Sequence, residues 1–146
     1  MRFTTTGLLI TLLLAGACRS TPGGPPEIVV DRTACSHCTM LISERRYAAA
    51  YQSPGSDPRI FDDIGCLLQA ARKESSTARR YWFHDGSDGT WIDGEPVFVV
   101  SPEFRTPMGG GILAYRDAAA AEQAARRYNG RIVRTVADLL NEKGEQ

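Results

Sequence analysis

The sequence has no surplus of either charge and no apolar run long enough to span a membrane. Its 146 residues include 17 lysine and arginine side chains and 17 aspartate and glutamate side chains, so the formal net charge is zero. Without a basic surplus the chain has no electrostatic attraction for phosphates, and we expect no nucleic-acid partner. The one mostly apolar run, over residues 7–14, is far shorter than the roughly 20 residues of a membrane-spanning helix.

The sequence patterns of common enzyme classes are also missing. No hydroxyl or thiol nucleophile stands with a general base in a recognisable hydrolytic arrangement, and no glycine-rich phosphate loop follows an expected strand. Asp62 and Asp63 are adjacent carboxylates, but their position ahead of a helical segment favours helix capping over acid–base catalysis. We therefore expect a protein that is not an enzyme.

The N-terminus has the pattern of an exported lipoprotein. Arg2 precedes the short apolar run, and Ala15-Gly16-Ala17 leads directly into Cys18. This arrangement resembles the lipobox of bacterial lipoproteins, although alanine rather than leucine stands three residues before the cysteine. We predict a signal peptide over residues 1–17 and lipidation of Cys18, with palmitate among the acyl chains, as the membrane anchor. Each buried methylene of such an anchor contributes about 0.8 kcal/mol.

The segment after the anchor lacks the composition of a folded region. Apart from prolines, the residues that follow Cys18 as far as Pro26 carry no apolar side chain, so we expect residues 18–26 to form a disordered, flexible tether. Arg19 replaces the aspartate that commonly retains lipoproteins at the inner membrane. This favours the outer membrane, on its periplasmic side, and the folded domain should then span residues 27–146.

Hydrophobic and turn patterns in that domain predict an α+β fold. Each half contains strands and a helix that begins at an aspartate, at Asp62 or Asp63 in the first half and at Asp117 in the second. We therefore predict an internal structural duplication of two small ββαβ-type lobes, over about residues 27–90 and 91–146. The expected strands are residues 27–30, 46–52, 59–61, 80–84, 95–100, 112–115 and 131–133, and the helices end near residues 73, 128 and 141.

Two sulfur-containing segments carry the candidate chemistry. The run Cys35-Ser36-His37-Cys38-Thr39-Met40 holds two thiols, an imidazole and a thioether. Soft sulfur ligands favour Cu(I), and a methionine two residues beyond a cysteine in an extended segment projects to the same side, so Cys38 and Met40 can bind one ion together. Met108 lies between a proline and three glycines, which predicts an exposed loop tip rather than a core position.

Four segments resemble the NosL family of copper-binding accessory lipoproteins for nitrous oxide reductase, namely residues 35–40, 61–67, 91–93 and 106–109. The resemblance implies a periplasmic, membrane-anchored metallochaperone that binds Cu(I) for assembly of the reductase in denitrification. Its implied partners are the apo-protein of that reductase or a related cuproenzyme, and a membrane copper transporter complex. It also implies Cys38, Met40 and Met108 as copper ligands, with Thr39 at a position where glycine is expected.

The roles of the remaining candidates stay open from the sequence alone. Three cysteines lie beyond the anchor, and an odd number argues against a closed disulfide framework. Three roles fit Cys35 equally from the pattern alone: a third copper ligand, a disulfide partner of Cys38, or a redox-active thiol that does not bind the metal. We expect His37 to face solvent, Cys66 to be a buried inert thiol of the first helix, and His84 to end a strand.

Two rival functions use the same cysteines. An extracytoplasmic thiol–disulfide oxidoreductase would use Cys35 and Cys38 as a Cys-x-x-Cys pair, but the strand, long helix and βαβ pattern of such enzymes are missing. A structural zinc site would combine Cys35, Cys38, Cys66 and His84, without the second close cysteine pair that zinc sites of this kind have. We favour the copper carrier over both.

Replacing Cys18 with serine should release the mature protein from membranes, because the cysteine sulfur is the attachment site of the lipid. In a bacterial host the parent should sediment with membranes and incorporate labelled palmitate, and Cys18→Ser should do neither. Cys38→Ser, which removes a thiol elsewhere, should behave like the parent. Recovery of the unlabelled parent in the soluble periplasm would contradict the anchor.

Overall fold

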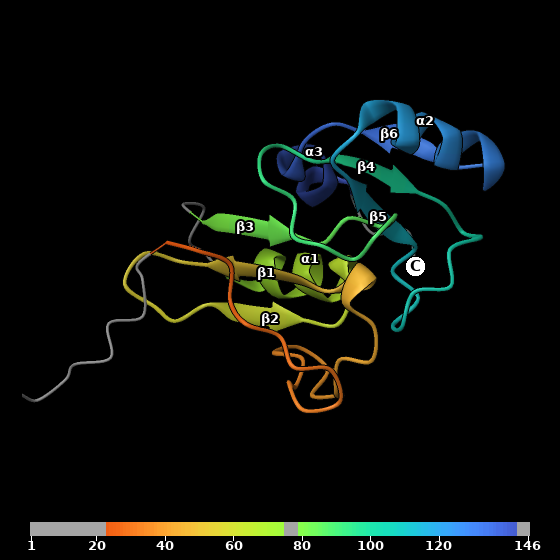
Figure 1. Cartoon of the computed structure of the whole chain (residues 1–146). Coiled ribbons are helices and arrows are strands. Elements are labelled where there is room, and N and C mark those ends of the chain that lie inside the picture. Colours follow the sequence, from red (N-terminus) through yellow and green to blue (C-terminus); the bar gives the residue numbers. More distant parts are fainter. Residues whose placement is uncertain (1–22, 75–78, 143–146) are drawn as a thin grey trace, which may run out of the picture.

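The computed structural model describes residues 23–74 and 79–142 (Figure 1). The predicted signal peptide, Cys18 and the first part of the predicted tether lie outside the described residues. In the part of the chain that is described, no helix has the length and apolar character needed to cross a membrane.

The first lobe is a three-stranded antiparallel sheet covered by one helix. β1 (Ala49–Gln52) is the central strand and pairs with β2 (Arg59–Phe61) on one side and β3 (Arg80–Phe83) on the other. α1 (Ile64–Lys73) begins directly after β2 and crosses the sheet before β3. A short 3-10 helix, η1 (Arg45–Tyr47), precedes β1.

The second lobe repeats this arrangement. β4 (Val97–Val100) is central and pairs with β5 (Ile112–Tyr115) and β6 (Arg131–Val133). α2 (Ala118–Arg127) connects β5 to β6, and α3 (Val136–Asn141) follows. Both lobes therefore have the order ββαβ with the first strand in the centre, which confirms the predicted α+β fold with two similar lobes.

Aspartate caps begin both long helices, because the first amides of a helix have no partner within it. Asp63 Oδ1 accepts a hydrogen bond from the amide of Cys66 at 2.8 Å, and Asp117 Oδ1 accepts one from the amide of Ala119 at 3.1 Å. The sequence left the first cap open between two neighbouring aspartates. The structure assigns it to Asp63.

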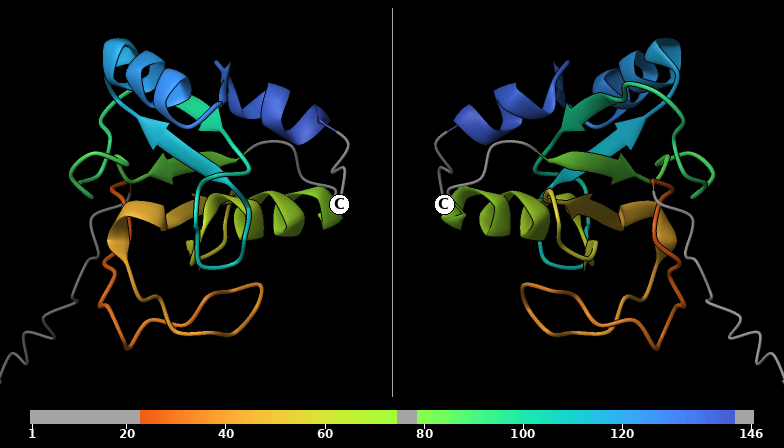
Figure 2. Two further views of the ribbon diagram at one scale, coloured as in Figure 1. Left: turned by 90° about the vertical axis from the view of Figure 1, so that its right-hand side faces the viewer. Right: turned by 90° about the vertical axis from the view of Figure 1, so that its left-hand side faces the viewer.

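A shared apolar core joins the lobes. The Phe83 ring of β3 meets the Phe98 ring of β4 edge-on, with 4.9 Å between centroids. Phe98 is buried in one cluster with Phe61 of β2 and Leu67 of α1, so the second sheet packs on the first lobe. Figure 2 shows α2 on the outer face of the second sheet and the cysteine-containing segment at the opposite side of the molecule.

The strand predicted over residues 27–30 is wrong. The backbone turns there, because the Val29 carbonyl accepts hydrogen bonds from the amides of Arg32 and Thr33, and Asp31 has a positive φ of 60°. Ile28 is nevertheless buried, in an apolar cluster with Ile42 and Ala48, whereas Val29 is exposed. The strand predicted over residues 46–52 begins only at Ala49, because η1 occupies the preceding residues.

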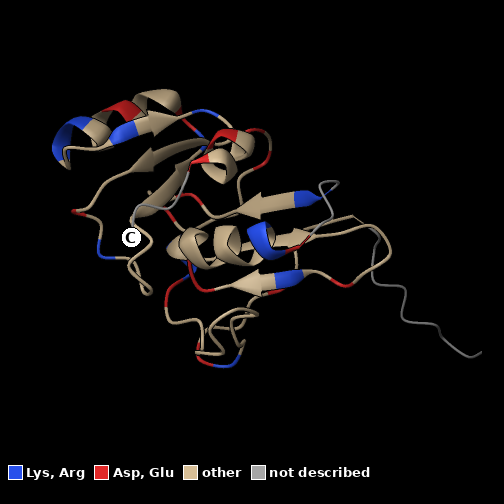
Figure 3. Cartoon of the chain, turned by 180° about the vertical axis from the view of Figure 1, so that it is seen from behind, with Lys and Arg blue, Asp and Glu red and all other residues tan. Residues whose placement is uncertain are grey.

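Acidic and basic residues are interspersed over both lobes in the described part of the chain (Figure 3). The neutral balance of the sequence is therefore not the sum of one acidic and one basic lobe.

Candidate metal centre

The cysteine segment, residues 35–40, is a tight loop closed by its own backbone. Ala34 and Leu41 form an isolated antiparallel bridge at its base, and the amide of Cys35 donates to the carbonyl of Met40 at 2.8 Å. Within the loop Thr39 has a positive φ of 67°. Glycine adopts this backbone region without strain and a β-branched residue does not. The position where the family resemblance suggested glycine is thus one where the backbone favours it.

Hydrogen bonds to β2 hold this loop on the first sheet. The amide of Ser36 donates to the Ile60 carbonyl at 2.7 Å, and the Ile60 amide donates to Ser36 Oγ at 3.2 Å. The Arg59 guanidinium donates to the Ser36 carbonyl at 2.9 Å. Since β2 is an edge strand, the loop satisfies polar groups that the sheet leaves unpaired.

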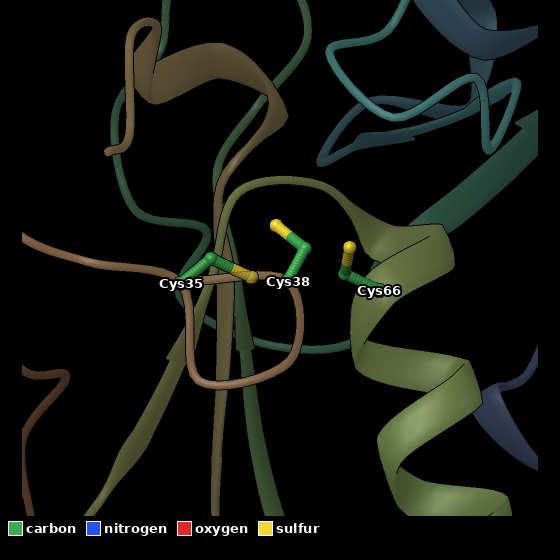
Figure 4. A group of neighbouring side chains, drawn as sticks. All are labelled: Cys35, Cys38 and Cys66. Atoms are coloured by element: carbon green, nitrogen blue, oxygen red, sulfur yellow. The ribbon is translucent and has the colours of Figure 1, made fainter. Parts of the chain in front are cut away.

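This docking brings the thiols of the loop to the first turn of α1, where Cys66 lies (Figure 4). The Sγ atoms of Cys35, Cys38 and Cys66 all lie within 4.8 Å of one another. Cys35 and Cys66 are only 2% and 1% exposed, whereas Cys38 is partly exposed. The cluster therefore has a buried side made by two thiols and an outer side at Cys38.

Hydrogen bonds make the three thiols differ in acidity. The Cys66 thiol donates to Cys35, as do the backbone amides of Cys38, Asp62 and His37, and together they lower the pKa of Cys35 to about 4. The pKa of Cys66 is raised, because its thiol donates to Cys35 and is itself buried. Burial also raises the pKa of Cys38. At neutral pH the cluster therefore holds one thiolate and two thiols, and a metal bound by all three displaces two protons.

The charges around the cluster have opposite effects on that thiolate. The cluster lies at the N-terminal end of α1, where the helix dipole stabilises negative charge. Asp62 is buried beside it, and its carboxyl has a raised pKa because of its own burial and the nearby Cys35 charge. From the sequence, Asp62 was one of two candidates for the helix cap. The cap is Asp63, and Asp62 instead contributes its backbone amide, which donates to Cys35.

The two methionines are exposed, as the loop-like sequence around them predicted. Met40 is 56% exposed and Met108 is 40% exposed. Met108 belongs to the β4–β5 loop of the second lobe, yet its amide donates to Asp63 Oδ2 at 3.1 Å. Because Asp63 also caps the helix of Cys66, the Met108 loop lies next to the first turn of α1, and Figure 2 shows it reaching down beside that helix.

The two histidines have partners of their own. His37 is half-buried, with Nε2 3.2 Å from Gln69 Oε1 of α1, where a solvent-facing side chain was expected. His84 is buried and stacked on Trp91 with 3.6 Å between ring centroids, and its Nδ1 lies 2.9 Å from the Ala48 carbonyl. Burial lowers the pKa of His84. Within residues 23–74 and 79–142, neither histidine joins the group formed by the three thiols.

Cys66 lies beside the loop thiols, although the sequence favoured an inert buried thiol and only the less favoured zinc alternative combined it with Cys35 and Cys38. Its neighbours Ile64 and Leu67 are core residues, so the local pattern favoured an inert buried thiol. One local signal was available, since a residue three positions after a cap must lie in the first turn, at the positive end of the helix dipole. Only the docking of residues 35–40 on β2 brings the other two thiols to that turn.

The oxidoreductase alternative lacks its structural context. Cys35 and Cys38 lie in a loop after which the next helical element is the three-residue η1, whereas a thioredoxin-like pair opens a long helix. The low pKa of Cys35 is typical of reactive thiols, but its side chain is almost fully buried. A thiolate in that position is poorly placed to attack the disulfide of another protein.

A family model described as NosL matches residues 26–142. The match begins at the end of the predicted tether and ends just after α3, so it covers both lobes. It also includes the three cysteines of the cluster and both exposed methionines. Comparison with curated protein sequences returned no match for the chain.

The reduced, metal-free protein should show thiolate ultraviolet absorbance at neutral pH that disappears only as the pH falls through about 4. A thiol with a lowered pKa is charged above that pKa and protonated below it, so the signal is lost on the acid side. Cys35→Ser should lack the neutral-pH signal, while Cys38→Ser should keep it. Cys66→Ala should move the titration toward higher pH, because the largest stabilising hydrogen bond is gone. An unchanged signal in Cys35→Ser would assign the thiolate to another residue.

Proposed function

This chain belongs to the NosL family, and we propose that it is a membrane-anchored Cu(I) carrier on the periplasmic side of a bacterial membrane. The observation that carries the proposal is the cluster of three thiols, two buried and one partly exposed, at the start of α1. Copper is here the cargo of the protein rather than a resident cofactor.

The donor set fits Cu(I) better than zinc. Thiolate and thioether sulfurs are soft ligands that select Cu(I), and two or three of them satisfy it. Three sulfurs around one ion at about 2.3 Å, a typical zinc–thiolate distance, lie roughly 4 Å apart. Sulfurs already within 4.8 Å of one another need only small movements. Structural zinc needs a fourth ligand, and no histidine or carboxylate joins the thiols in the described part of the chain.

The buried and exposed donors have different tasks in this proposal. Cys35 and Cys66 hold the ion on the inner side of the cluster, where their burial protects the thiolate from solvent and oxidants. Cys38 takes part from the outer side, with the thioethers of Met40 and Met108. A partner's sulfur or imidazole enters on this exposed side and replaces the weak thioethers first. Release then proceeds by ligand exchange without opening the core.

The proposed acceptor is the apo-protein of nitrous oxide reductase or a related cuproenzyme, and the proposed source of copper is a membrane transporter complex. Family membership and the lipobox-like N-terminus support these assignments. A fully extended tether over residues 18–26 reaches at most about 30 Å. Both partners must therefore present their copper sites close to the membrane surface, for which we propose the outer membrane.

Among Cys38, Met40 and Met108, copper binding should depend most on Cys38, because a cysteine binds the ion as a charged thiolate and the methionines as neutral thioethers. The reduced parent, produced with Cys18→Ser so that no lipid is attached, should bind about one equivalent of Cu(I) in competition with a Cu(I) chelator. Cys38→Ala should weaken binding about 100-fold, or about 2.7 kcal/mol. Met40→Leu and Met108→Leu should each weaken it about tenfold. These two changes conserve volume and should cost less than about 1.5 kcal/mol of unfolding free energy.

Three further measurements distinguish the alternatives. Cys66→Ala should also weaken binding, and its failure to do so would restrict the site to the loop and the methionines. His37→Gln, which replaces a half-buried neighbour of the cluster, should bind as tightly as the parent. A parent that takes up no Cu(I) but reduces insulin disulfides with thioredoxin-like turnover would favour the oxidoreductase instead.

A further inference from the structure

Asp63 makes more contacts than a helix cap needs. Its Oδ1 accepts the capping hydrogen bond from the Cys66 amide, while its Oδ2 faces the second lobe. There Oδ2 accepts from the Thr106 hydroxyl at 2.9 Å and from the amides of Met108 and Gly110 at 3.1 and 3.2 Å. The carboxylate is fully buried, at 0% exposure, so these four donors replace the water that it loses.

The Met108 loop, residues 106–111, is shaped to receive this carboxylate. Thr106 Oγ1 also accepts from the Gly111 amide at 3.2 Å, and the Gly109 amide donates to the Thr106 carbonyl at 3.0 Å. These bonds draw the loop into a compact turn whose amides point at Asp63. Met108 is therefore the exposed residue of a loop whose backbone is fixed.

Two glycines let the loop and the helix touch. A Cβ on Gly65, in the first turn of α1, would lie 2.7 Å from the Gly110 Cα, and one on Gly110 would lie 2.8 Å from the Gly65 Cα. Both neighbours are backbone atoms that cannot rotate away. The backbone of the second lobe thus rests directly on the helix turn that carries Cys66.

The internal duplication provides a comparison for Asp63. Asp117 occupies the same place in the second lobe, at the start of the helix between the second and third strands. It is exposed and accepts one hydrogen bond, from Ala119, as an ordinary cap does. Capping alone does not explain a buried carboxylate that also binds three donors of another lobe.

We propose that Asp63 is a positioning residue of the copper site, which holds the Met108 loop of the second lobe against the helix of Cys66. The thiols of one lobe and the thioether of the other then meet a single ion. The proposal rests on the proposed function, since it takes Met108 as a ligand. A pre-positioned loop loses little conformational freedom when its methionine binds, so the thioether contributes more to affinity than one on a free loop would.

Asp63→Asn tests this role with little change in shape. An amide has one oxygen, so either the Cys66 amide or the three donors of the loop lose their acceptor. Cu(I) affinity of the full chain in chelator competition should fall about tenfold, as for Met108→Leu. Asp117→Asn is the matched control, which changes the equivalent cap and should leave the affinity unchanged. Thr106→Val should weaken binding in the same direction, and Thr106→Ser, which keeps the hydroxyl, should restore it.

A double-mutant cycle separates positioning from general stability. In a Met108→Leu background, Asp63→Asn should cause no further loss of Cu(I) affinity, because the thioether that it positions is already absent. X-ray absorption of the copper-loaded Asp63→Asn variant should show one sulfur ligand fewer than the parent. Circular dichroism checks that Asp63→Asn folds. If it does not fold, Thr106→Val takes its place in the cycle with Met108→Leu.

Two results would overturn the proposal in distinguishable ways. If the losses from Asp63→Asn and Met108→Leu multiply, Asp63 acts independently of Met108, and the positioning role is wrong while the copper site stands. If Met108→Leu binds as tightly as the parent, Met108 is not a ligand. In that case the ligand assignment of the proposed function fails, and the positioning role fails with it.

Discussion

The first turn of α1 is the point on which the rest of the site depends, and the buried Asp63 carboxylate holds it together. A buried charge is stable only when donors surround it, and here those donors come from the helix itself and from a loop more than 40 residues away. The same turn presents its positive dipole end to the thiol cluster. One carboxylate thus caps the helix and seats the second-lobe loop on its first turn.

The duplicated fold places the thiol cluster in the first lobe and the Met108 loop in the second. Both lobes place an aspartate between the second strand and the helix, but the residue three positions later is Cys66 in the first lobe and Ala120 in the second. The second lobe has no thiol in the described residues and contributes its β4–β5 loop instead. Because the lobes share one core through Phe83 and Phe98, that loop and α1 are held at a fixed separation.

Local sequence patterns were sufficient for the repeated elements and insufficient for the site. The strand before α1, its aspartate cap and the α2 cap follow from turn signals and periodicity, which act within a few residues. The thiol cluster depends instead on Ser36 pairing with Ile60, and the loop contact on Asp63 meeting Met108, which lie 24 and 45 positions apart. Nothing in the pattern around Cys66 indicates either contact. The β-branched residues 28–30 misled because strand propensity is only a local preference, and here the backbone hydrogen bonds to the Val29 carbonyl form a turn instead.

A copper carrier must bind its ion firmly and still release it, and the gradient of burial across this site offers a physical basis for both. The Cys35 thiolate exists before the metal arrives, since hydrogen bonds hold its pKa near 4, so no proton has to leave that residue. Cys38 and Cys66 have raised pKa values, so each gives up a proton when it binds. In the proposed carrier, loss of copper returns those protons, so release is easier at lower pH and harder as the pH rises. In the proposed carrier the exposed thioethers carry no charge and no proton, so they exchange at the surface while the two buried sulfurs retain the ion until the partner has supplied ligands of its own.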